Sequence, residues 1–393
     1  MKSIISNKVE QMQPSGIRAF FDLVLGMKDV ISLGVGEPDF VTPWPIREAG
    51  IYSLEQGFTS YTSNKGLMKL RLSISRFLKS RYGLEYSPDD EILITVGVSE
   101  AYDLCLRAII NPGDRILVPS PGYVSYGPLV ELAGGVPVYM DTKGSGFKVT
   151  PQLIKRFADN RCKALVLNYP TNPTGVSYTK KELEDINKTL LKNNILCISD
   201  EIYADLTYDF NHTAFPSLNK ARDNTLYLNG FSKSYAMTGW RVGFACGPKD
   251  LIAAMTKIHQ YTIMCVSITS QMAACEALMY ASQRSILDMK REYNRRRQFI
   301  VSELNRLGLD CAMPQGAFYA FTSIKKTGLS SIDFAKKLLE QQKVAVVPGT
   351  AFGANCEGFI RISYASSMDK LKEAIARIEN FLATNTSLRA RTK

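Results

Sequence analysis

The clearest pattern in the chain is an alternation of short apolar runs with longer amphipathic ones, which begins near residue 90. Several short runs are rich in Val, Ile and Leu without polar alternation, which is typical of strands buried on both faces of a sheet. The runs that predict strands are EILITVG (91–97), RILVPS (115–120), VPVYMD (136–141), KALVLNYP (163–170), ILCISDE (195–201), TLYLNGF (225–231) and RVGFACG (241–247).

Amphipathic segments lie between many of these runs and predict helices. SEAYDLCLRAII begins with Ser99, a residue type that can cap a helix N-terminus. TKKELEDINKTLLKNN carries its charges on one side and Leu and Ile on the other. Strands that alternate with helices favour an α/β fold, in which helices cover both faces of a mostly parallel sheet.

The region from 250 to 310 predicts long helices, the last of which ends near Gly308. A smaller α/β mixture follows, with the apolar runs GAFYAFTSI, KVAVVPG and GFIRISYA and a final helix to about Leu382. At 393 residues the chain is long enough for two or three domains. We therefore expect a large domain over 47–285 with a mostly parallel, seven-stranded sheet. A smaller α/β domain over 286–393 would be joined by the N-terminal segment 1–46.

Composition and charge favour an ordinary globular protein. Hydrophobic residues make up 45% of the chain and charged residues 22%, and no apolar run is long enough to suggest a signal peptide or a membrane span. The eight scattered cysteines predict free, buried thiols in a reducing cytoplasm. The net charge of +11 is dispersed, apart from KREYNRRR (290–297), expected to be a solvated helix face, and SLRARTK (387–393), expected to be a frayed terminus. We expect neither a nucleic-acid nor a membrane partner.

Histidine is scarce, which limits the available chemistry. The chain has only His212 and His259, and it contains neither a GxSxG nor an HExxH motif. A Ser-His-Asp triad or a histidine-rich metal site would need one of these two residues. We therefore expect no metal site, and we expect another kind of side chain to move protons in any catalysis.

Polar residues gather at or just after the carboxyl ends of the predicted strands. In an open parallel sheet these ends border one crevice, where ligands bind. The group contains an acid, an amide, phenols and an amine, which together suggest a site rather than separate loop residues. Its members are Ser99, Tyr123, Asn172, Asp200, Tyr203 and Lys233.

A lysine amine in such a crevice can form a Schiff base with an aldehyde. If the aldehyde is pyridoxal 5'-phosphate (PLP), the carboxylate of Asp200 can pair with its ring nitrogen. Tyr203 and Asn172 can donate to its phenolate oxygen, and Tyr123 can pack on its ring. The turn Gly97-Val98-Ser99 opens a predicted helix, and the free N–H groups there can hold a phosphate. A mobile Lys233 could then carry the substrate proton.

Three motifs carry a resemblance to a known family. SKSYAMTGWRVGF (232–244), NYPTNPTG (168–175) and SDEIYADLTYD (199–209) resemble the class I/II, fold-type I PLP-dependent aminotransferases, of the aspartate and aromatic amino-acid kind. The resemblance extends from SGIRAFFDL (15–23) to RIENFL (377–382). It implies the PLP-dependent transferase fold, with a large and a small domain.

The resemblance also implies a role for each matching residue around the cofactor. Lys233 would be the Schiff-base lysine and the acid/base of the proton shift, and Asp200 would pair with the pyridine nitrogen. Arg241 would hold the phosphate together with the Gly97–Ser99 turn. Some members stack a Trp on the ring, whereas this chain has Tyr123 in PSPGYVSY, which puts the tuning of the ring in doubt.

Further matches concern the substrate and a second subunit. Arg361 in FIRISYA would grip the α-carboxylate, Gly36 in LGVGEPDF would let it approach closely, and Asn172 would also contact the substrate. Tyr61 matches a tyrosine that contacts the phosphate in the neighbouring subunit, which implies a homodimer with shared sites.

The main hypothesis is transfer of an amino group from an aromatic or aspartate-like L-amino acid to a 2-oxo acid, expected to be 2-oxoglutarate, by a ping-pong mechanism in amino-acid biosynthesis. The alternatives are a β-eliminating C–S lyase on the same scaffold and an aminotransferase of the diaminopimelate pathway. A DNA-binding regulator with this fold would need an added domain, and the chain offers no room for one before residue 30.

Overall fold

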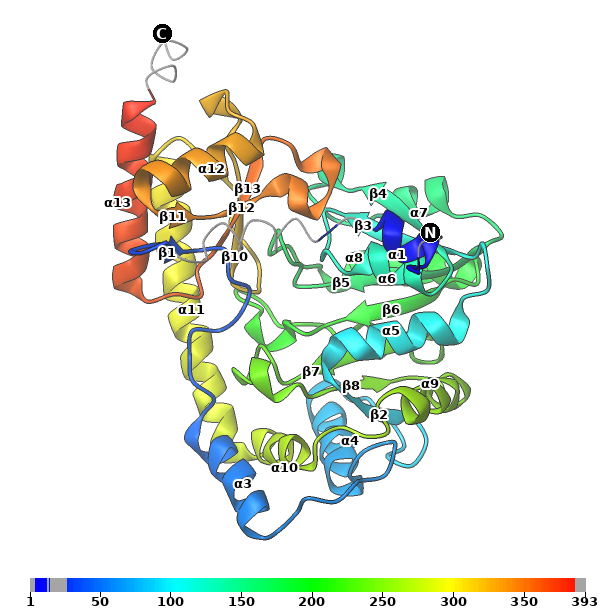
Figure 1. The fold of residues 1–393 in the computed structure, drawn as a ribbon. Coiled ribbons are helices and arrows are strands. Elements are labelled where there is room, and N and C mark those ends of the chain that lie inside the picture. Colours follow the sequence, from blue (N-terminus) through cyan, green and yellow to red (C-terminus); the bar gives the residue numbers. More distant parts are fainter. Residues whose placement is uncertain (1–3, 13, 15–26, 386–393) are drawn as a thin grey trace.

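A seven-stranded sheet forms the centre of the large part of the protein (Figure 1). The computed structural model describes residues 4–12, 14 and 27–385, with the backbone only for 280–283. The strand order is β2-β8-β7-β6-β5-β3-β4, and all neighbours are parallel except β8, which is antiparallel to both β2 and β7. The strands are β2 (Ile92–Thr95), β3 (Arg115–Ser120), β4 (Val136–Asp141), β5 (Cys162–Asn168), β6 (Leu196–Asp200), β7 (Thr225–Gly230) and β8 (Gly243–Cys246).

Each apolar run that predicts a strand forms one, which confirms the α/β fold class. The core is split by the sheet into two layers, because successive strand residues face opposite sides. One layer contains Ile116, Val118 and Val166 and packs against α5 (Gly97–Ile109), α6 (Tyr126–Leu132) and α9 (Lys249–Thr262). The other contains Leu117, Leu165 and Leu167 and packs against α7 (Pro151–Phe157) and α8 (Lys180–Lys192).

The prediction that Ser99 caps a helix is wrong. Helix α5 begins two residues earlier, at Gly97, and its N-cap residue Val96 makes no side-chain cap. The carboxylate of Glu100 instead accepts a hydrogen bond of 2.5 Å from the Val96 N–H. Ser99 is exposed in the first helical turn, so its hydroxyl is free to face the crevice rather than the backbone.

A second, smaller layer lies beside the large sheet. Its four-stranded antiparallel sheet has the order β12-β13-β10-β9, and β1 pairs in parallel with β11 next to it. These strands are β1 (Ile31–Ser32), β9 (Asp310–Cys311), β10 (Tyr319–Ser323), β11 (Val344–Ala345), β12 (Val347–Pro348) and β13 (Phe359–Ser363). The remaining helices are α1 (Asn7–Gln11), α3 (Trp44–Glu55), α4 (Met68–Tyr82), α10 (Ile268–Ala277), α11 (Tyr280–Arg306), α12 (Ser331–Gln342) and α13 (Met368–Thr384).

Helix α11 connects the two parts. It runs along one side of the molecule from α3 and α10 at one end to α13 at the other (Figure 1). Gly308 follows its end with a φ of +81°, a conformation that suits glycine and confirms the expected stop. The division expected between 285 and 286 falls inside this helix.

The expectation that KREYNRRR is a solvated face is wrong for its last two residues. Arg291 and Arg295 are exposed, but Arg296 and Arg297 are only 5% and 2% exposed. Each buried guanidinium pairs with a carboxylate from a distant segment, Asp39 for Arg296 and Asp209 for Arg297. The other basic stretch, 387–393, and the SGIRAFFDL segment, 15–23, lie outside the described residues.

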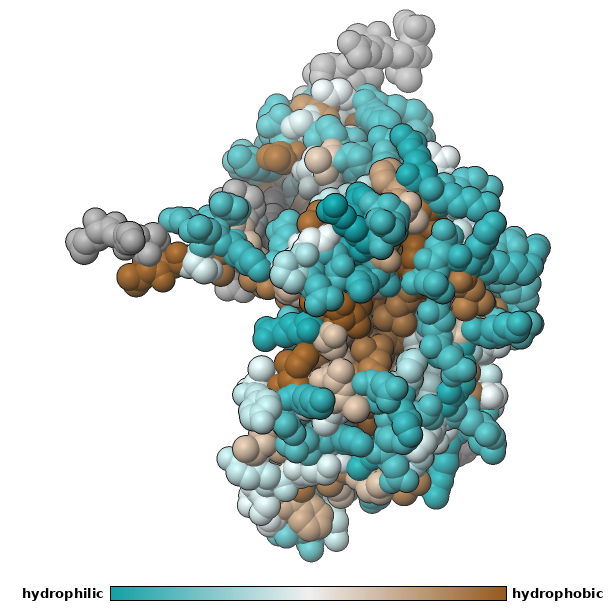
Figure 2. Space-filling model, turned by 90° about the vertical axis from the view of Figure 1, so that its right-hand side faces the viewer, coloured by the Kyte–Doolittle hydropathy of each residue, from teal (hydrophilic) through white to brown (hydrophobic). Residues whose placement is uncertain are grey.

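The surface and the cysteines add two observations. On the face in Figure 2, hydrophilic side chains surround a hollow in which hydrophobic ones gather. Within the described residues, no helix combines the length and the apolar character that crossing a membrane requires. All eight cysteines lie in the described part of the chain and are free; seven are buried, as predicted, and Cys265 is half-buried.

Candidate active site

A cavity of about 740 Å³ opens where the two parts of the protein meet. Its walls are the carboxyl ends of β5, β6 and β7, the start of α5, the loop before α6, residues 34–37, and side chains of β10 and β13. Ten of the twelve predicted site residues line it. They are Gly36, Val98, Ser99, Tyr123, Asn172, Asp200, Tyr203, Lys233, Arg241 and Arg361.

Asp200 ends strand β6 in the wall of the cavity and is 5% exposed. Its Oδ2 accepts a hydrogen bond of 2.6 Å from the hydroxyl of Tyr126, and its Oδ1 accepts one of 3.2 Å from the N–H of Ile202. Burial raises the pKa of Asp200 to about 6, although both hydrogen bonds oppose the rise. A buried carboxyl with such a pKa is well suited to a cationic partner.

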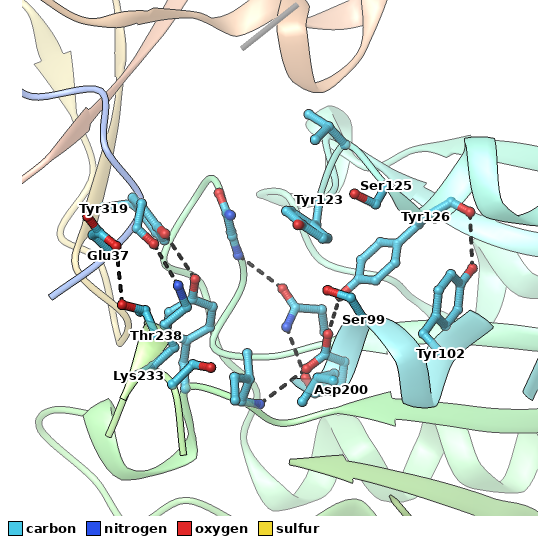
Figure 3. A pocket seen from close by; sticks show the side chains of 18 of the residues that line it. Glu37, Ser99, Tyr102, Tyr123, Ser125, Tyr126, Asp200, Lys233, Thr238 and Tyr319 are labelled. Atoms are coloured by element: carbon cyan, nitrogen blue, oxygen red, sulfur yellow. Dashed lines mark hydrogen bonds between the residues drawn. The ribbon is translucent and has the colours of Figure 1, made fainter. Parts of the chain in front are cut away.

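Lys233 follows β7 and lies in the cavity wall close to Tyr319, Glu37 and Thr238 (Figure 3). Its Nζ donates a hydrogen bond of 2.6 Å to the carbonyl oxygen of Gly36. Burial lowers the pKa of Lys233 to about 8, and the positive charges of Arg361 and Arg241 act in the same direction. Its amine therefore becomes neutral, and nucleophilic, nearer to neutral pH than an ordinary lysine.

Arg361 comes from the small sheet and is 2% exposed. It donates hydrogen bonds of 3.0 Å to the side-chain oxygen of Asn172 and of 2.5 Å to the carbonyl of Gly34. The rings of Tyr319 and Phe352 lie 4.5 and 4.8 Å from the guanidinium carbon. Among the described residues no partner takes the N–H of its Nε, and a buried unpaired donor is costly unless a ligand accepts from it. Burial lowers the pKa of this guanidinium.

The start of α5 forms a narrow cradle with Arg241. Gly97 has a φ of +74°, and a Cβ placed on it would lie 2.7 Å from Nη2 of Arg241. A Cβ on Gly243 would lie 2.7 Å from the carbonyl carbon of Gly97 and 2.8 Å from the N–H nitrogen of Val98. Glycine is therefore required at both positions. The cradle brings one guanidinium next to the positive end of a helix, which is an arrangement that binds anions.

Three tyrosines that line the cavity, Tyr102, Tyr126 and Tyr319, were missed by the sequence analysis. Tyr126 hydrogen-bonds Asp200 and packs edge-on against Tyr123 and Tyr102, with ring centroids 5.5 and 5.1 Å away (Figure 3). Tyr319 shares a hydrogen bond of 2.9 Å with the hydroxyl of Tyr203. Tyr126 is the second tyrosine of YVSY, and Tyr319 is the tyrosine of GAFYAF. Neither residue ends a predicted parallel strand, so the rule that identified the other site residues did not include them.

Two predicted site residues do not line the cavity. Gly97 lies directly behind Arg241, as its close approach shows. Tyr61 is 81% exposed, in the connection between α3 and α4, and is not part of this chain's cavity. Its role toward a neighbouring subunit stays a prediction.

Both histidines form buried pairs away from the cavity. His212 Nε2 lies 2.6 Å from Glu201, and His259 Nδ1 lies 2.7 Å from Glu100. The described residues that line the cavity include neither histidine. The titratable groups in the cavity wall are two acids, Glu37 and Asp200, one lysine, two arginines and five tyrosines.

Comparison with known proteins identifies the family. The family model for aminotransferase class I and II matches residues 28–378. A putative aminotransferase of Bacillus subtilis, YugH, is 50% identical over 98% of this chain and all of its own length. A probable N-acetyl-LL-diaminopimelate aminotransferase of the same organism is 41% identical over 97% of this chain and 96% of its own.

A solved structure agrees with this match. The aspartate aminotransferase from Thermus thermophilus with maleate is 37% identical, covers 97% of this chain and 100% of its own, and superimposes with a TM-score of 0.92. The close fit confirms the expected fold, and the family match extends across both parts of the molecule. This chain belongs to the class I and II aminotransferases.

Proposed function

We propose that this aminotransferase binds PLP and transfers the amino group of an aromatic or aspartate-like L-amino acid to a 2-oxo acid, 2-oxoglutarate, by a ping-pong mechanism. The observation that carries the proposal is that one cavity holds a lysine with a pKa of about 8, a buried acid with a pKa of about 6 and a buried arginine with a free N–H. These are the amine, the ring-nitrogen partner and the carboxylate grip that the family's chemistry needs.

The residues present fit the cofactor. The cradle of Gly97, Val98 and Arg241 offers an anion site of the kind that a phosphate needs. Asp200 lies across the cavity from Lys233, and Tyr123 lies above Asp200, where its ring could pack on the cofactor (Figure 3). When bound, PLP withdraws electrons from the substrate α-carbon.

The chain's own side chains supply the remaining chemistry. Asp200 would be ionised beside a cationic ring nitrogen, because a nearby positive charge lowers the pKa of a carboxyl group, and it would favour the protonated form of that nitrogen. Lys233 would hold the cofactor through its amine, and the same amine, with its lowered pKa, would move the substrate α-proton. Arg361 and Asn172, already joined by a hydrogen bond, orient the α-carboxylate beside Gly36. Tyr203 and Asn172 would donate hydrogen bonds to the ring oxygen.

The substrate side chain would lie against apolar and aromatic groups. Val35, Val98, Val124 and Leu129 line the cavity together with five tyrosines, which suits an aromatic side chain. The Thermus enzyme's name supports an aspartate-like donor. Transfer in the diaminopimelate pathway is a second candidate, favoured by the relative of that name at 41% identity.

Assembly and location complete the proposal. Exposed hydrophobic side chains gather on α3, α4 and the adjoining loops, including Trp44, Tyr52, Phe58 and Met68, and a second copy of the chain would cover them. Tyr61 lies among them and would reach the phosphate in that copy's site. The domains would be 47–285 and 286–393, with 1–46 attached to the latter through β1. Free cysteines agree with a cytoplasmic location.

The visible absorption spectrum of the purified protein tests this function. We expect a yellow protein whose band bleaches on addition of the correct amino donor alone and returns when 2-oxoglutarate is added. L-tyrosine, L-aspartate and N-acetyl-LL-diaminopimelate, added singly, would rank the donors. A protein that stays colourless after incubation with PLP would refute the assignment of Lys233. A band that persists with every donor would refute the proposed substrates.

A further inference from the structure

One short segment, residues 34–36, receives hydrogen bonds from both cations that would act on the substrate. Lys233 Nζ donates to the carbonyl of Gly36 over 2.6 Å. Arg361 Nη2 donates to the carbonyl of Gly34 over 2.5 Å. The position of this segment therefore sets where the amine and the guanidinium lie relative to one another.

The segment is anchored on both sides. Before it, Leu33 pairs by its backbone with Ala345 and Ser363 over 2.8 and 2.7 Å. After it, both carboxylate oxygens of Asp39 accept from Nη1 of Arg296, at 2.8 and 2.9 Å. Asp39 lies three residues beyond Gly36, so the chain between them spans at most about 10 Å.

Arg296 lies on helix α11 and, with its contacts to Asp39 and Phe40, forms what we call the clamp. Its side chain is 6% exposed, and its Nε donates to Glu292 on the same helix over 2.9 Å. The guanidinium carbon lies 5.1 Å from the ring of Phe40 and 5.6 Å from that of Tyr293. These two rings meet edge to face at 5.3 Å, so Arg296 and Tyr293 grip the Asp39–Phe40 dipeptide together.

Other contacts also hold this stretch. Next to Gly36, the hydroxyl of Thr238 donates a hydrogen bond of 3.2 Å to Glu37 Oε2. Thr42 bonds to the carbonyl of Ala236 over 2.6 Å and accepts from the indole N–H of Trp240 over 3.1 Å. These anchors fix the start of α3 to the large part. Among the described residues, the pair of Asp39 and Arg296 is the ion pair nearest to Gly36; Arg296 is buried, and the side chain of Asp39 is 27% exposed. The pair ties the segment to α11, the helix that connects both parts.

We propose that Arg296 is a positioning residue for catalysis, which through Asp39 holds the carbonyls of Gly34 and Gly36 against Arg361 and Lys233. The role rests on the proposed function of those two cations. Without the clamp, the segment would shift, Arg361 would lose a fixed orientation, and the amine of Lys233 would lose its acceptor. Since small displacements in an active site can cost about 100-fold, an anchor of this kind matters for kcat/KM, through the orientation of the two cations that would hold the substrate.

The test compares Arg296→Gln with Arg295→Gln. Arg295 is the matched control, because it neighbours Arg296, pairs with the same Glu292 and has a side chain that is 64% exposed. We expect Arg296→Gln to raise KM for the amino donor about tenfold or more, with a smaller fall in kcat. Arg296→Lys, which keeps a charge for Asp39, should recover part of the loss.

A second readout uses the cofactor-free protein. The rate at which an amine-acylating reagent modifies Lys233, mapped by mass spectrometry, reports whether its amine is held by Gly36. We expect acylation in Arg296→Gln to be about threefold or more faster than in wild type, and unchanged in Arg295→Gln. KM and acylation rates equal in the two glutamine variants would overturn the proposal.

The design separates this proposal from the proposed function. If Arg296→Gln does not fold, the double variant Asp39→Asn/Arg296→Gln, which leaves no buried charge unpaired, is measured by the same two readouts and judged by the same outcomes. A wild-type protein without a PLP band would refute the proposed function alone. The acylation of Lys233 would still decide whether Arg296 holds the segment.

Discussion

The hydroxyl of Tyr126 donates a 2.6 Å hydrogen bond to the carboxylate of Asp200, across 74 residues of sequence. Tyr126 begins α6 and Asp200 ends β6, and both are buried. Burial alone would favour the neutral acid, whereas this hydrogen bond favours the carboxylate. Under the proposed function, this bond would favour the ionised form of Asp200 that pairs with the ring nitrogen of the cofactor.

Removing the Tyr126 hydroxyl should lower catalytic activity without preventing the cofactor from binding. In Tyr126→Phe we expect kcat/KM to fall about tenfold or more, because a hydrogen bond to a charged group contributes about 1.5–3 kcal/mol. Steady-state kinetics measure the change. Tyr102→Phe is the control, since the Tyr102 hydroxyl bonds only the backbone carbonyl of Tyr126. Equal losses in the two variants would contradict the role of the Tyr126 hydroxyl.

Replacing Asp200 should lower activity without lowering the stability of the folded protein. We expect Asp200→Asn to lower turnover about 1,000-fold, because the ring nitrogen loses its ionic partner. The pKa of Asp200 is about 6 in the folded protein and 3.8 in the unfolded chain. The folded protein therefore gains stability from neutral Asp200 below pH 3.8 and loses it as the pH rises through 6. Cofactor-free Asp200→Asn should therefore match or exceed wild type in urea unfolding at pH 8. A variant clearly less stable than wild type at pH 8 would argue against this view of the site.

Lys233 should reduce the stability of the cofactor-free protein. The pKa of Lys233 is about 8 in the folded protein and 10.5 in the unfolded chain. The folded protein is therefore most stable above pH 10.5, where the amine is neutral in both states, and this stability is lost as the pH falls through 8. At pH 7 we expect Lys233→Met to be inactive yet more stable, by at most about 3 kcal/mol, since each pKa unit corresponds to about 1.4 kcal/mol. Thermal unfolding at pH 7 and pH 10 measures the difference, which should shrink at the higher pH. Lys181→Met, whose side chain is 70% exposed, should show no such dependence.

Replacing Arg361 should lower activity toward every amino donor to a similar extent. A lysine keeps the charge but lacks the planar fork, so in Arg361→Lys we expect kcat/KM to fall about 100-fold, mainly through KM. The loss should be similar for tyrosine and aspartate, because both carry the same α-carboxylate. Arg222→Lys, a partly exposed arginine paired with Glu91, is the control. A loss confined to one donor would mean that Arg361 binds the substrate side chain instead.

Mixed dimers should reveal whether sites are shared. Subunits carrying Lys233→Ala are mixed with subunits carrying Tyr61→Phe, and each preparation alone should bind PLP poorly or not react. If Tyr61 serves the neighbouring site, the hybrid contains one site with both Lys233 and Tyr61, and its PLP affinity should match wild type at half the occupancy. Hybrids no better than the Tyr61→Phe homodimer would show that Tyr61 does not act across an interface.

The sequence alone was sufficient for the strands of the large sheet and for the polar residues at the strand ends that line the cavity. Runs such as KALVLNYP are apolar on both faces, and that local property depends on no partner. Asp200 and Lys233 could be found because parallel strands place their carboxyl ends at one edge of a sheet. Arg361 lies on an antiparallel strand, and it was identified only through the family resemblance.

Only the tertiary structure decided which polar groups meet. Tyr203 and Tyr319 share a hydrogen bond across 116 residues, and Arg296 pairs with Asp39 across 257. Hydrophobic periodicity shows which face of a helix is apolar, but a buried arginine looks like a solvated one until its carboxylate is known. The clamp on α11 and the hydrogen bond from Tyr126 to Asp200 depend on partners far apart in the sequence. Local patterns along the chain do not indicate such partners.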